Sequence, residues 1–88
     1  MTRATVSKAP VVVKLEALAK EFDATGDYYA RFAGEHNDLL RRESKRSARQ
    51  LRAVAEQVQY RGYTEAYGAY WLKAGWRIIV AIGRGHIV

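Results

Sequence analysis

The sequence predicts an all-α protein: a helical hairpin or three-helix domain with a long central helix, assembled as a homo-oligomer. Apolar residues recur at steps of three and four along most of the chain, the spacing of an amphipathic helix. Helix-ending signals near Gly26 and Gly62 divide this pattern into three segments. The chain is 49% apolar, with two Trp and six Tyr, so it folds in spite of its net charge of +6.

Chain length is the reason to expect self-association. A domain of 88 residues buries only about 60 to 65% of its unfolded surface, so a monomer is marginally stable. The widest apolar stripe lies on the last predicted helix, and we expect copies of the chain to meet there. The predicted oligomer interface consists of Tyr67, Trp71, Trp76, Ile78, Ile79 and Ile82.

The first predicted helix covers residues 11–24 and follows a flexible arm, residues 1–9. Pro10 suits the first turn of a helix, where its missing amide hydrogen costs nothing. Thr25 and Gly26 mark the predicted end. The apolar residues at helical spacing are Val12, Leu15, Leu18, Ala19 and Phe22. A short strand over Val11–Val13 is the alternative interpretation.

The second predicted helix covers residues 27–59 and forms the central rod. Asp27 is a plausible N-cap, and no proline or glycine pair interrupts the chain before Gly62. Such a helix has about 33 residues and a length of roughly 50 Å, with Gly34 as its weak point. The flanking helices are expected to pack along its first and second halves, respectively.

The third predicted helix covers residues 64–82, and the tail is residues 84–88. Gly62 is the predicted C-terminal cap of the preceding helix, and Thr64 is the predicted N-cap of this one. Apolar residues cover more than half of its circumference, so it contacts more than one neighbour. Because Ile78, Ile79 and Val80 are β-branched, a strand over residues 76–82 is the alternative interpretation.

One face of the central helix is strongly basic. On a helical wheel its six cations fall within an arc of roughly 140°, opposite the apolar stripe. Between residues 41 and 52 the only acid is Glu43. The six cations are Arg41, Arg42, Lys45, Arg46, Arg49 and Arg52.

We expect this basic face to bind a macromolecular partner. Arginine predominates, and its planar guanidinium forms bidentate contacts with carboxylates and phosphates. An acidic protein surface is favoured over nucleic acid, because no helix-turn-helix spacing, zinc finger or RNA-binding signature is present. Non-specific contact with phosphates is the second interpretation. A plain solvated face explains the same residues equally well, since cations late in a helix also complement its dipole.

A second candidate site lies on the narrow polar strip of the third predicted helix. Tyr70, Lys73 and Arg77 place one aromatic ring beside two cations. An alternative function is therefore an oligomer that sequesters a small anionic ligand, for example a nucleotide, at a subunit interface.

Composition and motifs argue against several other classes. The chain has no cysteine, which excludes disulfides and thiolate zinc sites, and no metal or cofactor motif is present. His36 and His86 are far apart and have no nucleophile at a recognisable spacing, so no enzyme is predicted. Residues 66–83 have Lys73 and Arg77 near their middle, which argues against a membrane span. With no signal-like segment, we expect a cytoplasmic, non-enzymatic binding protein of the regulator or inhibitor type.

Overall fold

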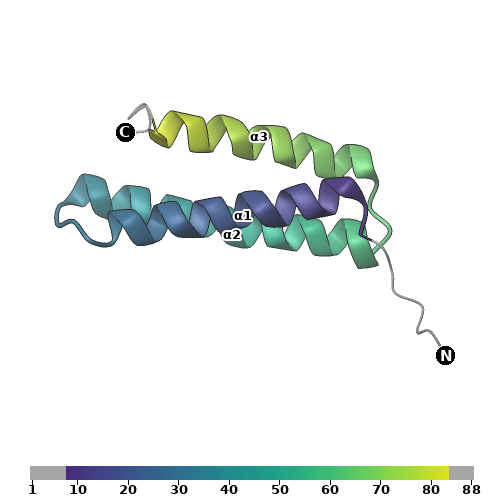
Figure 1. Ribbon diagram of the computed structural model, residues 1–88, viewed down its shortest axis with the longest axis horizontal. Coiled ribbons are helices and arrows are strands. Elements are labelled where there is room, and N and C mark those ends of the chain that lie inside the picture. The colour runs from purple at the N-terminus through teal and green to yellow at the C-terminus, as the bar shows by residue number, and fades with distance from the viewer. Residues whose placement is uncertain (1–7, 84–88) are drawn as a thin grey trace.

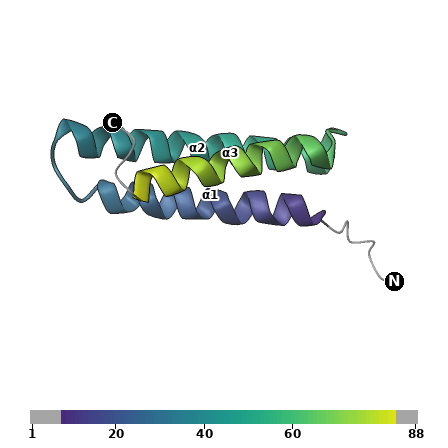
Figure 2. The ribbon, with the colours of Figure 1, turned by 90° about the horizontal axis from the view of Figure 1, so that it is seen from above.

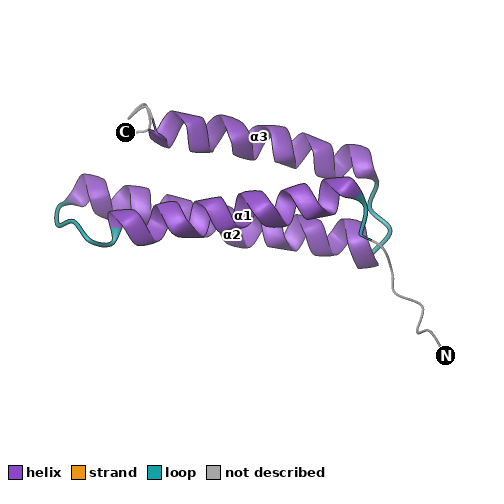
Figure 3. Cartoon of the chain, in the orientation of Figure 1, coloured by secondary structure: helices purple, strands orange, loops and turns teal. Residues whose placement is uncertain are grey.

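The computed structural model describes residues 8–83, which form three α-helices and no strand (Figures 1 and 3). They are α1 (Pro10–Tyr29), α2 (Glu35–Tyr60) and α3 (Glu65–Gly83). The predicted all-α class with three helices is therefore confirmed. Both strand interpretations are wrong, because residues 11–13 and 76–82 are helical.

The helices form an elongated bundle. Helices α1 and α2 make an antiparallel hairpin, and α3 returns in the direction of α1 (Figure 1). Seen from above, α3 lies over α1 and α2 and between them (Figure 2). The predicted arrangement, with one neighbour on each half of the central helix, is wrong. Helix α3 contacts both α1 and α2.

Most of the core belongs to the hairpin. Phe22, Leu15 and Leu18 of α1 are fully buried against Leu40 and other apolar residues of α2. Among the buried apolar residues in the described range 8–83, α3 contributes Ile82 alone. The remaining α2 members are Ala48, Leu51, Val54 and Ala55.

The boundary between the first two helices differs from the predicted one. Helix α1 continues through Gly26 to Tyr29, and α2 begins at Glu35, so the predicted helix over 27–59 is wrong at its start. Gly26 is buried and faces α2, where its missing side chain makes room for the methylene stem of Lys45. The break falls instead at Gly34, whose φ of 112° is a conformation that other residues avoid. Helix α2 therefore has 26 residues.

The other three boundary signals act as predicted. Pro10 occupies the first turn of α1. Gly62 has a φ of 78° and follows the end of α2, where the Tyr63 amide donates to the Gln57 carbonyl over 3.2 Å. The Thr64 hydroxyl accepts a hydrogen bond from the Tyr67 amide at 3.1 Å, which caps α3.

Two glycines let α3 approach the hairpin closely. A Cβ atom at Gly68 would lie 3.1 Å from Val11 of α1 and 3.2 Å from Val58 of α2. A Cβ atom at Gly75 would lie 2.8 Å from Leu18 of α1 and 3.3 Å from Leu51 of α2. Gly68, Gly75 and Ile82 are seven residues apart, and all three are buried. They form the contact line of α3 with the hairpin.

The predicted terminal segments lie largely outside the described residues. This holds for residues 1–7 of the predicted arm and for the whole predicted tail, 84–88, including His86. Lys8 is described, and its Nζ lies 2.9 Å from Glu16 Oε1. Across residues 8–83, each helix is too short or too polar to cross a membrane.

Candidate functional site

The six predicted cations on α2 do not form one uniform surface. Lys45 and Arg52 lie toward α1, whereas Arg42, Arg46 and Arg49 point away from the apolar core. We call these three arginines the outer row. On α2 they occupy positions i, i+4 and i+7, which share one ridge of the helix.

Lys45 and Arg52 join α2 to α1. Lys45 Nζ lies 2.8 Å from Asp27 Oδ1 and 3.5 Å from Asp23 Oδ1, and the Arg52 guanidinium pairs with Asp23. The hydrogen bond from Arg52 lowers the pKa of Asp23, and the hydrogen bond to Asp27 raises the pKa of Lys45. The stem of Lys45 crosses Gly26 to reach these carboxylates. This cluster therefore fastens the hairpin.

Asp38, in the first turn of α2, pairs with two successive arginines. Arg41 Nη2 donates to Asp38 Oδ1 at 2.6 Å, and Arg42 Nε lies 3.1 Å from Oδ2. The hydrogen bond from Arg41 lowers the pKa of Asp38. Arg42 remains 62% exposed in spite of its ion pair, so one side of its guanidinium is open to a partner.

Arg46 and Arg49 are the least restrained of the six cations. The Arg46 side chain is 70% exposed and lies 3.7 Å from Glu43, a loose ion pair. Arg49 is exposed, and no carboxylate among residues 8–83 forms an ion pair with it. Two strong cations are therefore available at the surface.

Sequence reasoning missed the two acids of α1. For the six cations, i,i+4 spacing within one helix gives two acidic partners, Asp38 for Arg42 and Glu56 for Arg52. Asp23 and Asp27 are themselves one turn apart on α1, and this spacing was a usable signal. It went unused because the first helix was predicted to end before Asp27.

The second predicted site forms an open strip on α3. Tyr70, Lys73 and Arg77 are all exposed and lie on one side of the helix, as their spacing predicts. The Tyr70 ring meets Trp71 edge-on with ring centroids 5.9 Å apart. Tyr70 is 69% exposed, so these residues form an open strip that does not enclose a ligand.

The predicted oligomer interface is divided between core and surface. Ile82 is 2% exposed in the single chain, so it is a core residue and does not face a second copy. Tyr67, Trp71 and Ile79 are half-buried against the same core. The Tyr67 hydroxyl donates to Gln57 Oε1 at 3.1 Å. Of the predicted set, Trp76 and Ile78 are exposed.

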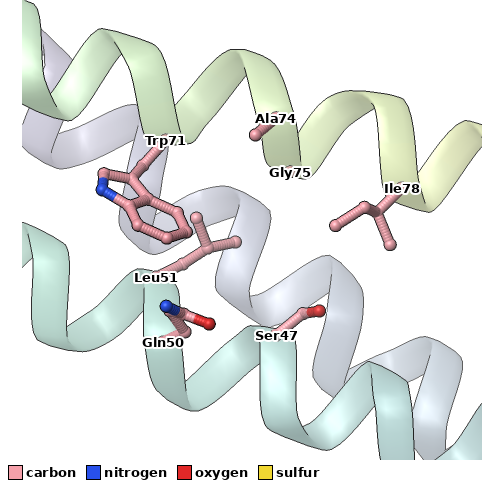
Figure 4. A pocket seen from close by; sticks show the side chains of 7 residues that line it. All are labelled: Ser47, Gln50, Leu51, Trp71, Ala74, Gly75 and Ile78. Carbon is pink, nitrogen blue, oxygen red and sulfur yellow. The ribbon is translucent and has the colours of Figure 1, made fainter.

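A small hollow lies between α2 and α3, beside the outer row. Its volume is about 40 Å³, and Figure 4 shows the side chains of Leu51, Trp71 and Ile78 around it. Gly75 contributes only backbone, which leaves the space open. Ser47, Gln50 and Ala74 complete the lining. The hollow is mainly apolar and opens at the surface.

Residues 8–83 bring no three His, Asp or Glu side chains together in an arrangement that would hold a metal ion. His36 is exposed in the first turn of α2. No protein-family model, curated protein or solved structure matches this chain.

Proposed function

We propose that this is a non-enzymatic binding protein whose outer row contacts acidic side chains of another protein. The observation that carries the proposal is the division of the cations on α2. Lys45 and Arg52 are engaged by α1, whereas Arg42, Arg46 and Arg49 point outward. Fastening the hairpin therefore accounts for Lys45 and Arg52, whereas the ion pairs of the outer row are with acids of α2 itself and do not join two helices.

The geometry of the outer row suits a small cluster of carboxylates. At a rise of 1.5 Å per residue, residues 42–49 span roughly 10 Å along the helix. Each guanidinium can form a bidentate contact with one carboxylate. Because one exposed ion pair contributes only about 0.2 to 1 kcal/mol, a stable complex needs all three arginines and further contacts.

The acids around the outer row favour a protein over a nucleic acid. Asp38 lies between Arg41 and Arg42, and Glu43 lies beside Arg46. These carboxylates repel a continuous phosphate backbone, whose affinity grows with the number of phosphates neutralised. A protein surface can place a few carboxylates between them. Non-specific nucleic-acid binding is the alternative that the experiment must separate.

The test compares two variants that lose the same charge. One carries Arg42→Gln, Arg46→Gln and Arg49→Gln. The control carries Lys14→Gln, Lys20→Gln and Arg31→Gln, three cations that are also exposed. Both variants and the unchanged chain are used to capture proteins from a nuclease-treated lysate of the source cells, and the captured proteins are quantified.

We expect the outer-row variant to lose its principal partner and the control variant to keep it. Equal capture by all three proteins would overturn the proposal. In parallel, labelled duplex and single-stranded DNA are titrated with the unchanged chain at about 50 and 200 mM salt. Tight DNA binding that falls steeply with salt, together with no specific protein captured from the nuclease-treated lysate, would assign the surface to nucleic acid instead.

A further inference from the structure

The groove between α2 and α3 combines an apolar hollow with cations on both sides. We propose that it receives an amphipathic α-helix of the partner protein, with an apolar side chain in the hollow and carboxylates on the helix flanks. This inference deepens the proposed function, since Arg46 of the outer row belongs to one rim. Arg77 of α3 stands on the other rim and joins the two sites predicted from the sequence.

The register of the two helices places the rim cations close together along the groove. Gly75 lies against Leu51, and Gly68 lies against Val58, so α2 and α3 run antiparallel with a fixed alignment. In that alignment Arg46 and Arg77 both lie beyond the Gly75 contact, on the side away from Gly68. Their levels differ by about three residues, or roughly 4.5 Å along the axis.

The same two arginines flank the hollow across the groove. Arg46 lies one helical turn before Gln50, and Arg77 lies one turn after Ala74, and both Gln50 and Ala74 line the hollow. Both arginines are exposed. A helix lying over Leu51 and Trp71 therefore has a cation on either side.

Size and shape identify the occupant as a helix. The hollow, at about 40 Å³, has room for the end of one apolar side chain. The groove between two packed helices is straight, and it accepts apolar residues spaced at i, i+3, i+4 and i+7. Helix α3 already occupies the groove between α1 and α2 in this manner.

Charge identifies the occupant as an acidic partner and not a second copy of the chain. A second copy has a net charge of +6, and its exposed ridges on α2 and α3 carry the outer row and the Lys73–Arg77 strip. Either ridge would bring cations against Arg46 and Arg77. The one acid at this rim, Glu43, holds Arg46 only loosely, at 3.7 Å. A partner carboxylate can replace it.

The probe is a synthetic helix of about 20 residues with leucines on one face and glutamates on its flanks. A scrambled peptide of the same composition keeps the charge and loses the apolar face. Binding is followed through the indole NH signals of the ¹⁵N-labelled chain. Trp71 lines the hollow, whereas Trp76 is exposed and does not line it, so Trp76 is an internal control.

We expect the amphipathic peptide to shift the Trp71 signal and leave that of Trp76 in place. The scrambled peptide should bind at least tenfold more weakly. Equal affinity for both peptides, or an unmoved Trp71 signal on binding, would overturn the groove inference and leave the proposed function standing. No binding of either acidic peptide would also overturn the groove inference, whereas the capture experiment alone decides the proposed function.

Two variants test the hollow directly. Ser47→Leu fills it from the rim, and Ala53→Leu adds the same side chain to an exposed position of α2 that does not line it. We expect Ser47→Leu to raise the Kd for the amphipathic peptide at least tenfold and Ala53→Leu to leave it unchanged. Unchanged binding by folded Ser47→Leu would refute occupation of the hollow, and the paired change Arg46→Gln and Arg77→Gln separately tests the rims.

Discussion

The α1–α2 hairpin and the docked helix α3 are held by different means. The hairpin buries nearly all of the apolar core and is fastened by Lys45 and Arg52 on its outer seam. Helix α3 contributes one fully buried apolar side chain, Ile82, and approaches through two glycines. Large side chains therefore stabilise the hairpin, whereas the absence of side chains positions the third helix.

This difference shows which part of the molecule is free to serve a partner. The face of α3 turned away from the hairpin is exposed, and the hollow beside Gly75 remains unfilled. The hairpin supplies a stable support for the outer row. The outer row and the hollow thus both lie where few side chains are needed for packing within the chain.

The largest expected effect comes from breaking the hairpin core. Phe22 is 0% exposed, and Phe22→Ala removes a ring that its neighbours cannot replace, at a cost of about 3 to 5 kcal/mol in the free energy of unfolding. Urea denaturation followed by circular dichroism measures this loss. Tyr28→Ala, at an exposed position of the same helix, should cost far less; an equal loss would contradict the packing difference.

The next largest effect should come from blocking the approach of α3. A Cβ atom added at Gly75 would lie 2.8 Å from Leu18. Gly75→Leu should therefore push α3 away from the hairpin and lower the free energy of unfolding by about 1 to 3 kcal/mol. Hydrogen exchange should become faster in α3 than in α1 and α2. Gly83→Leu is the control, because no side chain among residues 8–83 lies within 4 Å of a Cβ there. Uniformly faster exchange in all three helices would show that α3 is not a separate unit.

A third variant should strengthen the hairpin. The Ser44 hydroxyl is buried at the α1–α2 interface, and no hydrogen-bond partner for it lies among residues 8–83. Ser44→Ala removes an unsatisfied polar group and raises helix propensity, so the free energy of unfolding should rise by about 1 kcal/mol. Ser47→Ala, at a half-exposed site, should gain only a few tenths. Destabilisation by Ser44→Ala would mean that the hydroxyl has a role in packing.

The smallest expected effect concerns the ion pairs of the seam. The folded protein lowers the pKa of Asp23, so its contribution to stability is present above the unfolded pKa of about 3.9 and is lost as the pH falls through the lower folded value. Asp23→Asn should cost less than about 1 kcal/mol at pH 6, because the site is partly exposed.

Thermal melts at pH 6 and at pH 2.5 check this expectation. The difference between the unchanged chain and Asp23→Asn should narrow at the lower pH. Glu21→Gln, at an exposed position of α1, should melt like the unchanged chain at pH 6. A difference for Asp23→Asn that persists unchanged at pH 2.5 would show that its carboxylate acts by some means other than its charge.

Local signals in the sequence were sufficient for the helices themselves. Pro10, Gly62 and Thr64 mark boundaries through their own backbone or side-chain chemistry, and each occurs at its predicted place. Gly26 misled the prediction because its role is tertiary. In the sequence a glycine indicates the end of a helix. The structure shows that Gly26 instead makes room for the stem of Lys45.

The candidate surface was predictable only in outline. Helical spacing correctly places the cations of α2 on one side, but it cannot separate Lys45 and Arg52 from the outer row. That separation depends on Asp23 and Asp27, which reach α2 only after the chain turns at Gly34. Gly68 and Gly75 likewise lower helix propensity locally. Their favourable effect, the close approach of α3 to Val11 and Leu18, is visible only in the folded structure.

The order of the helices along the chain has a consequence for biosynthesis. The hairpin is contiguous, so all its contacts are available once residue 60 has left the ribosome. The contacts of α3 with α1 join residues much farther apart in the chain than the contacts within the hairpin, so we expect them to form later during folding. Until α3 packs, the apolar surface that it covers on the hairpin is open to a chaperone.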